Sequence, residues 1–251
     1  MKNRKTELPD VHEEYAEVNV LGGVGNLTHI HKGKGWMLPI NYSILVPTQN
    51  RRGVHMSRLV AAIQKNSENE RIEYSMRDIC KEVNRTQPGC KIICEIRYSY
   101  QDQFIPIIIK MGEKGNIQYI FSRTGITACP CSKVMVGIGH MQRAELTLKM
   151  ISGKIQDFDN VAWKMGECFS TIPKEHLKRE DEGEKIQEAQ SKPRFAEDVV
   201  RECLTRFSNA TSIEVKSFES IHLHDAVAYW SKRVRDVPKT INKIHITDNG
   251  F

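Results

Sequence analysis

The sequence predicts an α+β protein built on an antiparallel sheet. Three observations predict this class. Some short segments alternate apolar and polar residues, and others repeat apolar residues at helical spacing. Along the chain, strands follow one another with helices inserted between them. With 251 residues, 39% of them apolar and 27% charged, the chain has the composition of an ordinary globular protein with a substantial core.

The first half of the chain is predicted to contain four strands and two helices. Residues 38–47 mix β-branched and apolar side chains, which is typical of a strand. Residues 56–66 and 75–85 place apolar residues at helical spacing, and Ser75 is expected to cap the second helix. The alternating segments that follow predict three more strands, with a turn at 112–116 before the last: 90–101, 104–111 and 117–123.

The second half has a loosely similar order. Residues 142–151 predict a strand and 156–169 a helix whose start Asp157 is expected to cap. The charged stretch 174–192 has no strong apolar face, so we expect a loop or a linker there. The remaining elements are predicted as a helix, a strand and a final helix: 195–207, 211–220 and 224–234. Two similar modules in tandem are therefore expected, although no sequence repeat proves them.

Charge and cysteine content limit the partners and the compartment. The excess of 37 basic over 31 acidic residues gives a net charge of +6, which only weakly favours a phosphorylated molecule or a nucleic acid. No aromatic-interleaved basic stripe is present, so we expect no nucleic-acid partner. No apolar run is long enough to span a bilayer, and no secretory signal follows the basic N-terminus. Seven scattered cysteines fit a reducing compartment, and we expect a cytoplasmic protein without a membrane partner.

The first candidate site lies in the segment TGITACPCSKVMVGIGHMQR, residues 124–143. It places Cys129, Cys131 and His140 in a bend rich in glycine and proline. Thiolate and imidazole are good ligands for Zn²⁺ and acceptable ones for Fe²⁺ or Mn²⁺. The alternative is that the cysteines are small buried hydrophobic residues, which is their usual role. Because Pro130 stiffens the bend and directs at least one thiol outward, we favour the metal site.

The second candidate site is the segment SFESIHLHDAVAYW, where an acidic residue, two histidines and an aspartate fall within seven positions. These are Glu219, His222, His224 and Asp225, at the junction of the predicted last strand and last helix. The alternative for a single histidine is a structural place at the helix start, where Asp225 would complement the helix dipole. The complete cluster favours a functional site.

Two further segments carry weaker signals. Residues 51–58, RRGVHMSR, place His55, Ser57 and Arg58 at a strand-to-helix junction, where arginines and backbone N–H groups suit phosphate oxygens. A solvated basic turn is the equally simple alternative. The acids of LKREDEGEK, among them Glu182, are most simply solvent-exposed, unless the fold brings Glu182 to a metal.

In order and approximate spacing, four segments resemble the type IB GTP cyclohydrolases, also called the type IV family in archaea. The segments are RGVHMSR, GITACPCS with GHMQR, LKREDE followed by KPRFAEDVVRE, and FESIHLHDA, and the resemblance spans residues 39–229. It implies one domain, 1–251, with a tunnelling fold. Its two modules, at about 15–125 and 126–240, would be antiparallel sheets, each with two helices packed on one face. It also implies a homotetramer with active sites at subunit interfaces.

The resemblance also implies a reaction and a set of roles. GTP would be hydrolysed to formate and 7,8-dihydroneopterin triphosphate, or to the 2′,3′-cyclic phosphate in an archaeal-type variant, with Fe²⁺, Mn²⁺ or Zn²⁺ as cofactor. The implied metal ligands, three of them catalytic, are Cys129, His140, His222 and Glu182, with Glu180 as a close alternative carboxylate. Glu219 would anchor the guanine edge. His55, Ser57 and Arg58 are expected at the ribose-phosphate end, and His224 is expected to assist proton transfer.

Three other interpretations remain as alternatives: a paralogue recruited to another pathway, a nitrile reductase and a non-catalytic relative. His140 lies 11 residues after Cys129, one fewer than in bacterial members, and HMQR replaces the commoner His-Asn-Gln-Arg. Such departures suit a paralogue recruited to another pathway. A nitrile reductase would use Cys129 as a nucleophile with NADPH and no metal. A non-catalytic relative would only bind a metal or a nucleotide.

Overall fold

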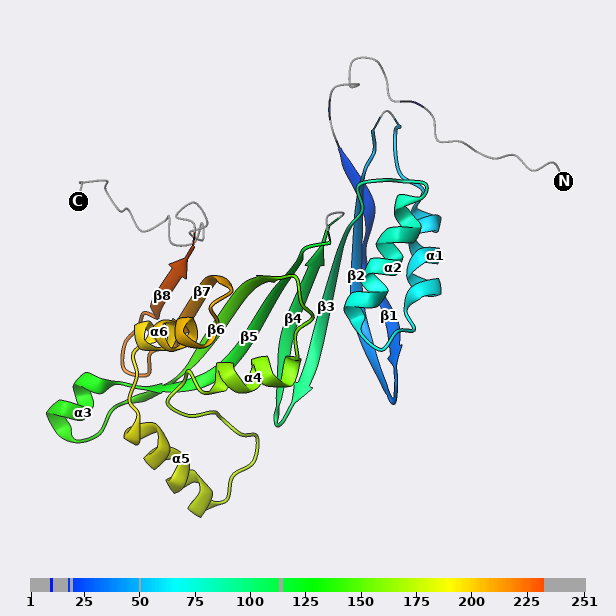
Figure 1. Ribbon diagram of the computed structural model, residues 1–251. Coiled ribbons are helices and arrows are strands. Elements are labelled where there is room, and N and C mark those ends of the chain that lie inside the picture. Colours follow the sequence, from blue (N-terminus) through cyan, green and yellow to red (C-terminus); the bar gives the residue numbers. More distant parts are fainter. Residues whose placement is uncertain (1–9, 11–17, 19, 50, 113–114, 233–251) are drawn as a thin grey trace, which may run out of the picture. The chain divides into compact units, whose positions relative to one another are not determined.

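The computed structural model of the protein describes residues 10, 18, 20–49, 51–112 and 115–232. Its eight strands pair in sequence order, from β1 to β8 (Figure 1). The antiparallel ladders include β1–β2, β2–β3, β6–β7 and β7–β8. The strands are β1 (Leu21–Gly33), β2 (Trp36–Pro47), β3 (Lys91–Tyr100), β4 (Gln103–Met111), β5 (Ile117–Ala128), β6 (Met141–Ser152), β7 (Ala210–Ser217) and β8 (Ala226–Ser231). The helices are α1 (Met56–Asn66), α2 (Ile72–Asn84), α3 (Pro130–Val136), α4 (Phe158–Gly166), α5 (Arg179–Ser191) and α6 (Ala196–Arg206).

The predicted α+β class is confirmed, but the predicted tunnelling-fold architecture is wrong. That prediction expected two sheets in tandem, each with two helices on one face. Instead, all eight strands belong to one sheet, and the described residues form six helices. One reason is that β5 continues to Ala128, beyond its predicted end at 123, and is a neighbour of β6, so the ladder does not stop between the two halves.

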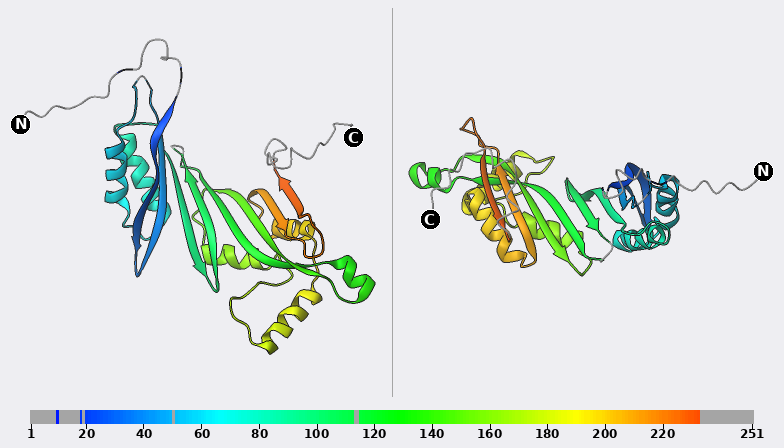
Figure 2. Two further views of the ribbon diagram at one scale, coloured as in Figure 1. Left: turned by 180° about the vertical axis from the view of Figure 1, so that it is seen from behind. Right: turned by 90° about the horizontal axis from the view of Figure 1, so that it is seen from above.

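The described residues form two compact units, and the first consists of those within 1–97, 107–119 and 152–155. In it, α1 and α2 pack beside each other, and α1 contacts β1 (Figure 2). The alternating residues Ile40, Tyr42, Ile44 and Val46 of β2 are fully buried, as the sequence pattern predicts. The capping role predicted for Ser75 is wrong, because α2 begins three residues earlier and Ser75 is buried inside it.

The second unit consists of the described residues within 98–106, 120–151 and 156–232. Asp157 caps α4 as predicted, since its carboxylate accepts the Asn160 N–H at 3.2 Å. The loop or linker expected at 174–192 is in fact largely the helix α5. The predicted helix at 224–234 is also wrong: β8 occupies 226–231 and pairs with β7, and 233–234 lie outside the described residues. In β8, Val227 is exposed and Ala228 is buried, an alternation that suits a strand.

The thiols differ in accessibility. All seven cysteines are free, and five of them are buried. The two that are not are Cys129, which is half-buried, and Cys131, which is exposed. The bend singled out from the sequence therefore holds both accessible thiols. Among the described residues, no helix combines the length and the apolar content that crossing a bilayer requires.

His31 makes the stability of the first unit depend on pH. Its ring is fully buried, with Nε2 at 3.0 Å from the Asn69 carbonyl oxygen and a stacking contact with Trp36. Burial lowers the pKa of His31 below 6.5, against the opposing effect of the Asn69 hydrogen bond. Because the unfolded chain then binds more protons, this contribution is present above pH 6.5 and is lost as the pH falls below it.

We therefore expect the free energy of unfolding to decrease as the pH falls from above 6.5 towards the lowered pKa of His31. Urea unfolding at a series of pH values on either side of 6.5 measures this decrease. In a His31→Gln variant, which is expected to be less stable overall, the decrease should be smaller. Equal slopes in the two proteins would show that His31 does not cause it.

Candidate functional site

The backbones of Cys129 and His140 lie side by side although 11 residues separate them. The Cys129 N–H donates to the His140 carbonyl oxygen at 2.9 Å, which closes the loop that contains α3. Gly139 makes this approach possible, because a Cβ at that position would lie 2.5 Å from the Cys129 carbonyl oxygen. The bend thus holds the first two predicted ligands at one end of β5 and β6.

A glutamine from α5 holds the loop from outside. The side-chain amide of Gln190 forms two hydrogen bonds of 2.8 Å with Gly139: it accepts the Gly139 N–H and donates to the Gly139 carbonyl oxygen. Ser132 adds a third contact, as its hydroxyl accepts the His140 N–H at 3.1 Å. The backbone on both sides of the Gly139–His140 peptide bond is therefore fixed before any ligand binds.

A chain of hydrogen bonds orients the imidazole of His140, whose side chain is 17% exposed. Its Nδ1 lies 2.8 Å from Gln142 Oε1, and Gln142 Nε2 donates to Thr127 Oγ1 at 3.1 Å. Thr127 Oγ1 is 3.4 Å from Ser217 Oγ, and both hydroxyl residues are buried. Since the oxygen of the Gln142 amide faces the ring, His140 donates from Nδ1 and keeps the Nε2 lone pair available for a ligand.

The segment after β7 brings the second cluster to His140. The Phe218 N–H donates to the Arg143 carbonyl oxygen at 2.9 Å, which extends the β6–β7 pairing. Glu219 follows, and its Oε2 lies 3.9 Å from His140 Nδ1 with only 10% of the side chain exposed. The His222 ring is 6.2 Å from the His140 ring, edge to face, and it stacks on His224 at 5.1 Å.

This cluster lies in a loop, so the structural alternative given for Asp225 does not apply. No helix starts at Asp225, which instead forms an ion pair with Lys216 at 2.8 Å. His222 and His224 are exposed, whereas Glu219 is nearly buried. The loop therefore supplies one sheltered carboxylate and two accessible imidazoles to the same corner of the second unit.

The donor types at this corner fit a divalent metal. A thiolate, imidazoles and a carboxylate are the ligands that Zn²⁺ takes in proteins, and imidazole also suits Fe²⁺. Cys129 is partly accessible, and His140 has its Nε2 free for coordination. In the described part of the chain, however, no three such side chains are close enough to hold one ion. The corner thus supplies suitable donors without a preformed coordination shell.

The other predicted site residues form two sets, one on α5 and one at the start of α1. Glu182, in the first turn of α5, and neighbouring Glu180 are exposed, and neither carboxylate has a hydrogen bond or ion pair among the described residues. His55, Ser57 and Arg58 lie in the first unit, at the start of α1. Desolvation, then the charges of Arg58 and Arg51, lower the pKa of His55.

The sequence interpretation missed two residues that shape this corner. Gln142 is part of the GHMQR motif, and its position two residues after His140, at the start of a strand, places both side chains on one face. That signal was available. Gln190 gave none, because its contact with Gly139 depends on α5, a helix with a single buried residue, Ala189.

Gln142 can be tested through the tautomer of His140. In the metal-free chain, ¹⁵N NMR is expected to show the proton of the neutral His140 ring on Nδ1 in native protein. In a Gln142→Leu variant, it should show a mixture of the Nδ1–H and Nε2–H tautomers. Zn²⁺ affinity should fall by about 10–100-fold, as for other residues that orient a metal-binding histidine. Gln142→Glu, which can still accept from Nδ1, should restore much of it. The matched control is Gln64→Leu on the exposed face of α1. An unchanged tautomer in Gln142→Leu would contradict this role.

Comparison with known proteins adds independent information. A family model described as type I GTP cyclohydrolase FolE2 matches residues 31–228, which include every predicted site residue. A GTP cyclohydrolase MptA of Thermoplasma volcanium is 32% identical over 237 residues, covering 77% of this chain and 83% of that protein. The MptA of Picrophilus torridus is 28% identical and covers 71% and 75% of the two chains. A GTP cyclohydrolase FolE2 of Desulfovibrio desulfuricans is 31% identical and covers 74% and 79%.

Proposed function

This chain belongs to the type I GTP cyclohydrolase FolE2 family and is a GTP cyclohydrolase; from that premise we propose that it hydrolyses GTP at guanine C8 with the help of a divalent metal. The observation that carries the proposal is the convergence of the ends of β5, β6 and β7. Cys129, His140, Glu219 and His222 come from distant parts of the sequence to this one corner. Family membership also sets aside the nitrile reductase alternative.

Cys129, His140 and His222 are the residues proposed to hold the metal. Fe²⁺, Mn²⁺ and Zn²⁺ all suit these donors. Such an ion, when bound, acts as a Lewis acid that makes water a nucleophile at neutral pH. Glu182 is the proposed carboxylate ligand, with Glu180 as the alternative. It is supported by its place on α5, the helix whose Gln190 binds the backbone next to His140.

Glu219 is proposed to bind the guanine edge. An ionised carboxylate accepts two N–H bonds, which matches the N1–H and 2-amino groups of guanine and not the edge of adenine. The low exposure of Glu219 supports this role, since a hydrogen bond shielded from water discriminates more strongly. His224, which stacks on His222, is proposed to exchange protons with the reacting base. His55, Ser57 and Arg58 are proposed to bind the ribose-phosphate end.

For the product, we propose 7,8-dihydroneopterin triphosphate released together with formate. The 2′,3′-cyclic phosphate is the second candidate. It is supported by the similarity to the two MptA proteins.

We also propose an oligomeric state and a cellular compartment for the chain. A homotetramer with active sites at subunit interfaces is supported by exposed apolar side chains close to the site: Val134, Met135, Val136, Ile138, Ile221 and Leu223. Light scattering that gives the mass of a single 28.8-kDa chain would contradict it. Seven free thiols support a reducing compartment, which we propose to be the cytoplasm.

The metal requirement is tested by removal and return of the ion. Chain stripped with a chelator is expected to release no formate from GTP, and Mn²⁺ or Fe²⁺ should restore release together with a pterin-like absorbance. Binding of GTP without formate, in reconstituted protein, would identify a non-catalytic relative. Full activity in stripped protein would contradict the metal.

A further inference from the structure

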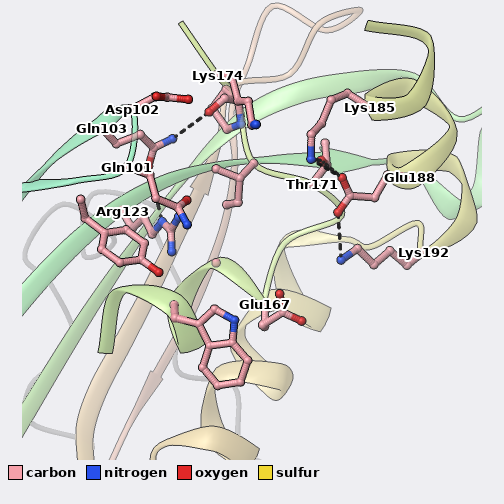
Figure 3. Close-up of a pocket in the computed structure, with 15 residues that line it drawn as sticks. Gln101, Asp102, Gln103, Arg123, Glu167, Thr171, Lys174, Lys185, Glu188 and Lys192 are labelled. Atoms are coloured by element: carbon pink, nitrogen blue, oxygen red, sulfur yellow. Dashed lines mark hydrogen bonds and ion pairs between the residues drawn. The ribbon is translucent and has the colours of Figure 1, made fainter. Parts of the chain in front are cut away.

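The second unit has a cavity that is lined by none of the site residues discussed above. It encloses about 540 Å³ between the β3–β4 turn, β5, α4, the 171–174 loop and α5 (Figure 3). This volume is typical of small-molecule sites. Its charged lining residues are four cations and three acids: Arg123, Lys174, Lys185, Lys192, Asp102, Glu167 and Glu188. Nothing in the proposed reaction uses them.

Arg123, on β5, lies at the inner wall of this cavity and is only 3% exposed. Its Nη1 donates to the Ala162 carbonyl oxygen and its Nε to Gln103 Oε1 at 3.4 Å. Among the described residues, no carboxylate forms an ion pair with this guanidinium, and Nη2 makes no hydrogen bond. Burial lowers the pKa of Arg123 because enclosing a cation is costly, and neighbouring groups, Glu167 among them, offset only part of this effect.

Two lysines of the α5 wall share one carboxylate. Glu188 accepts from Lys185 Nζ and from Thr171 Oγ1, both at 2.6 Å, and Lys192 Nζ lies 3.5 Å away (Figure 3). Burial alone raises the pKa of Glu188, but the donors and charges of these neighbours outweigh it and hold the pKa below its usual value. Glu188 is therefore ionised, and it neutralises only one of its two lysines.

The part of the cavity lined by Arg123, Lys185, Glu188 and Lys192 thus has an excess of positive charge. Arg123 and the two lysines face the carboxylate of Glu188, while Asp102 and Glu167 are exposed to solvent. Among the described residues, Lys174 is an exposed cation without an ion pair. We infer that this cavity binds a small phosphate-bearing molecule, whose oxygens balance the excess positive charge of Arg123, Lys185 and Lys192 over Glu188. Nη2 of Arg123 and the ammonium of Lys192 are the groups that would donate to it.

A purely structural role for Arg123 is the competing explanation. The guanidinium joins β5 to α4, and it packs so closely on Gly166 that a Cβ there would lie 2.5 Å from Nη1. Such a clamp explains the burial of Arg123. It leaves unexplained the adjacent cavity and the two lysines, Lys185 and Lys192, that share the single carboxylate of Glu188. If Arg123 is only a clamp, Lys192 has no part in binding an anion. The two explanations therefore predict different pyrophosphate affinities for a variant of Lys192.

The test is a titration of the metal-free, full-length chain with inorganic pyrophosphate. Calorimetry is expected to show saturable binding that weakens by about tenfold or more in Lys192→Gln, the loss of one charge-assisted hydrogen bond. Lys91→Gln, an exposed lysine on β3, removes the same charge elsewhere and should bind as the native chain. Trp163, 54% exposed on the cavity wall, should report binding by fluorescence, and Trp163→Phe should remove that signal while calorimetric binding persists.

Arg58→Gln separates this cavity from the proposed ribose-phosphate end of the substrate site. Native-like pyrophosphate binding by Arg58→Gln supports the cavity, and loss of binding there would overturn it. No saturable binding at millimolar concentrations, or unchanged binding by Lys192→Gln, would also overturn it. Lys192→Gln keeps the Lys185–Glu188 pair, and circular dichroism verifies its fold. If Lys192→Gln unfolds, Lys174→Gln, a change at an exposed position of the cavity, replaces it. Its pyrophosphate binding should then be weaker than that of Lys91→Gln.

Discussion

Replacing Cys129 with alanine is expected to lower GTP turnover by about 10³-fold or more and to remove most of the bound metal. The thiolate is the softest donor of the corner. We expect no other cysteine to replace it, because five are buried and Cys131 is exposed on α3. The backbone contacts of residue 129 do not use the side chain: its N–H donates to His140 and its carbonyl oxygen accepts from Lys133. The fold should therefore survive the change.

Cys131→Ala is the matched control for this prediction. It removes an identical group two residues away, and its effect on turnover and on metal content should be small. Steady-state formate release and metal content by mass spectrometry are measured on both variants. Equal losses in the two would mean that the ligand has been assigned to the wrong thiol.

Replacing Glu219 with glutamine is expected to weaken GTP binding by about 10–100-fold, the loss of a charged hydrogen-bond acceptor in a sheltered site. The metal should be retained, because Glu219 is proposed to touch the base and not the ion. Inosine triphosphate, which lacks the 2-amino group, sharpens the test. The native chain should prefer GTP strongly, and Glu219→Gln should lose most of that preference.

Asp225→Asn is the control for Glu219, since it neutralises an exposed carboxylate of the same loop that is already paired with Lys216. Equilibrium binding of GTP and of its inosine analogue, with metal content measured in parallel, distinguishes the roles. Loss of metal from Glu219→Gln would overturn its assignment to the base. An unchanged preference for GTP would show that other groups read the guanine edge.

Sequence patterns predicted those elements whose side chains divide between core and solvent. The bounds of α1 and β2 follow closely from buried residues at helical and alternating spacing. The helices α3 and α5 were missed because the first buries no residue and the second only Ala189, which leaves no periodicity to detect. The six residues of β8 are too short a run for periodicity alone to separate a strand from a helix.

The architecture was harder to predict than its elements, because no short sequence segment indicates which strand of one half of the chain pairs with a strand of the other half. The β5 strand passes through its predicted end, and this continuation, invisible to a segment-by-segment interpretation, overturned the two-module tunnelling fold. At the site, motifs selected Cys129, His140, Glu219 and His222 as candidates, and the structure brings these residues to one corner. The motifs could not identify Gln190, which matters only because α5 brings its amide to Gly139.

The central claim is that this corner removes C8 of guanine as formate. Incubation of the metal-reconstituted chain with GTP labelled with ¹³C at C8, followed by mass spectrometry and ¹³C NMR, tests it directly. The label is expected in formate, with an unlabelled pterin carrying either a linear triphosphate or a cyclic phosphate. Label that stays in the nucleotide or in a purine product would contradict the account.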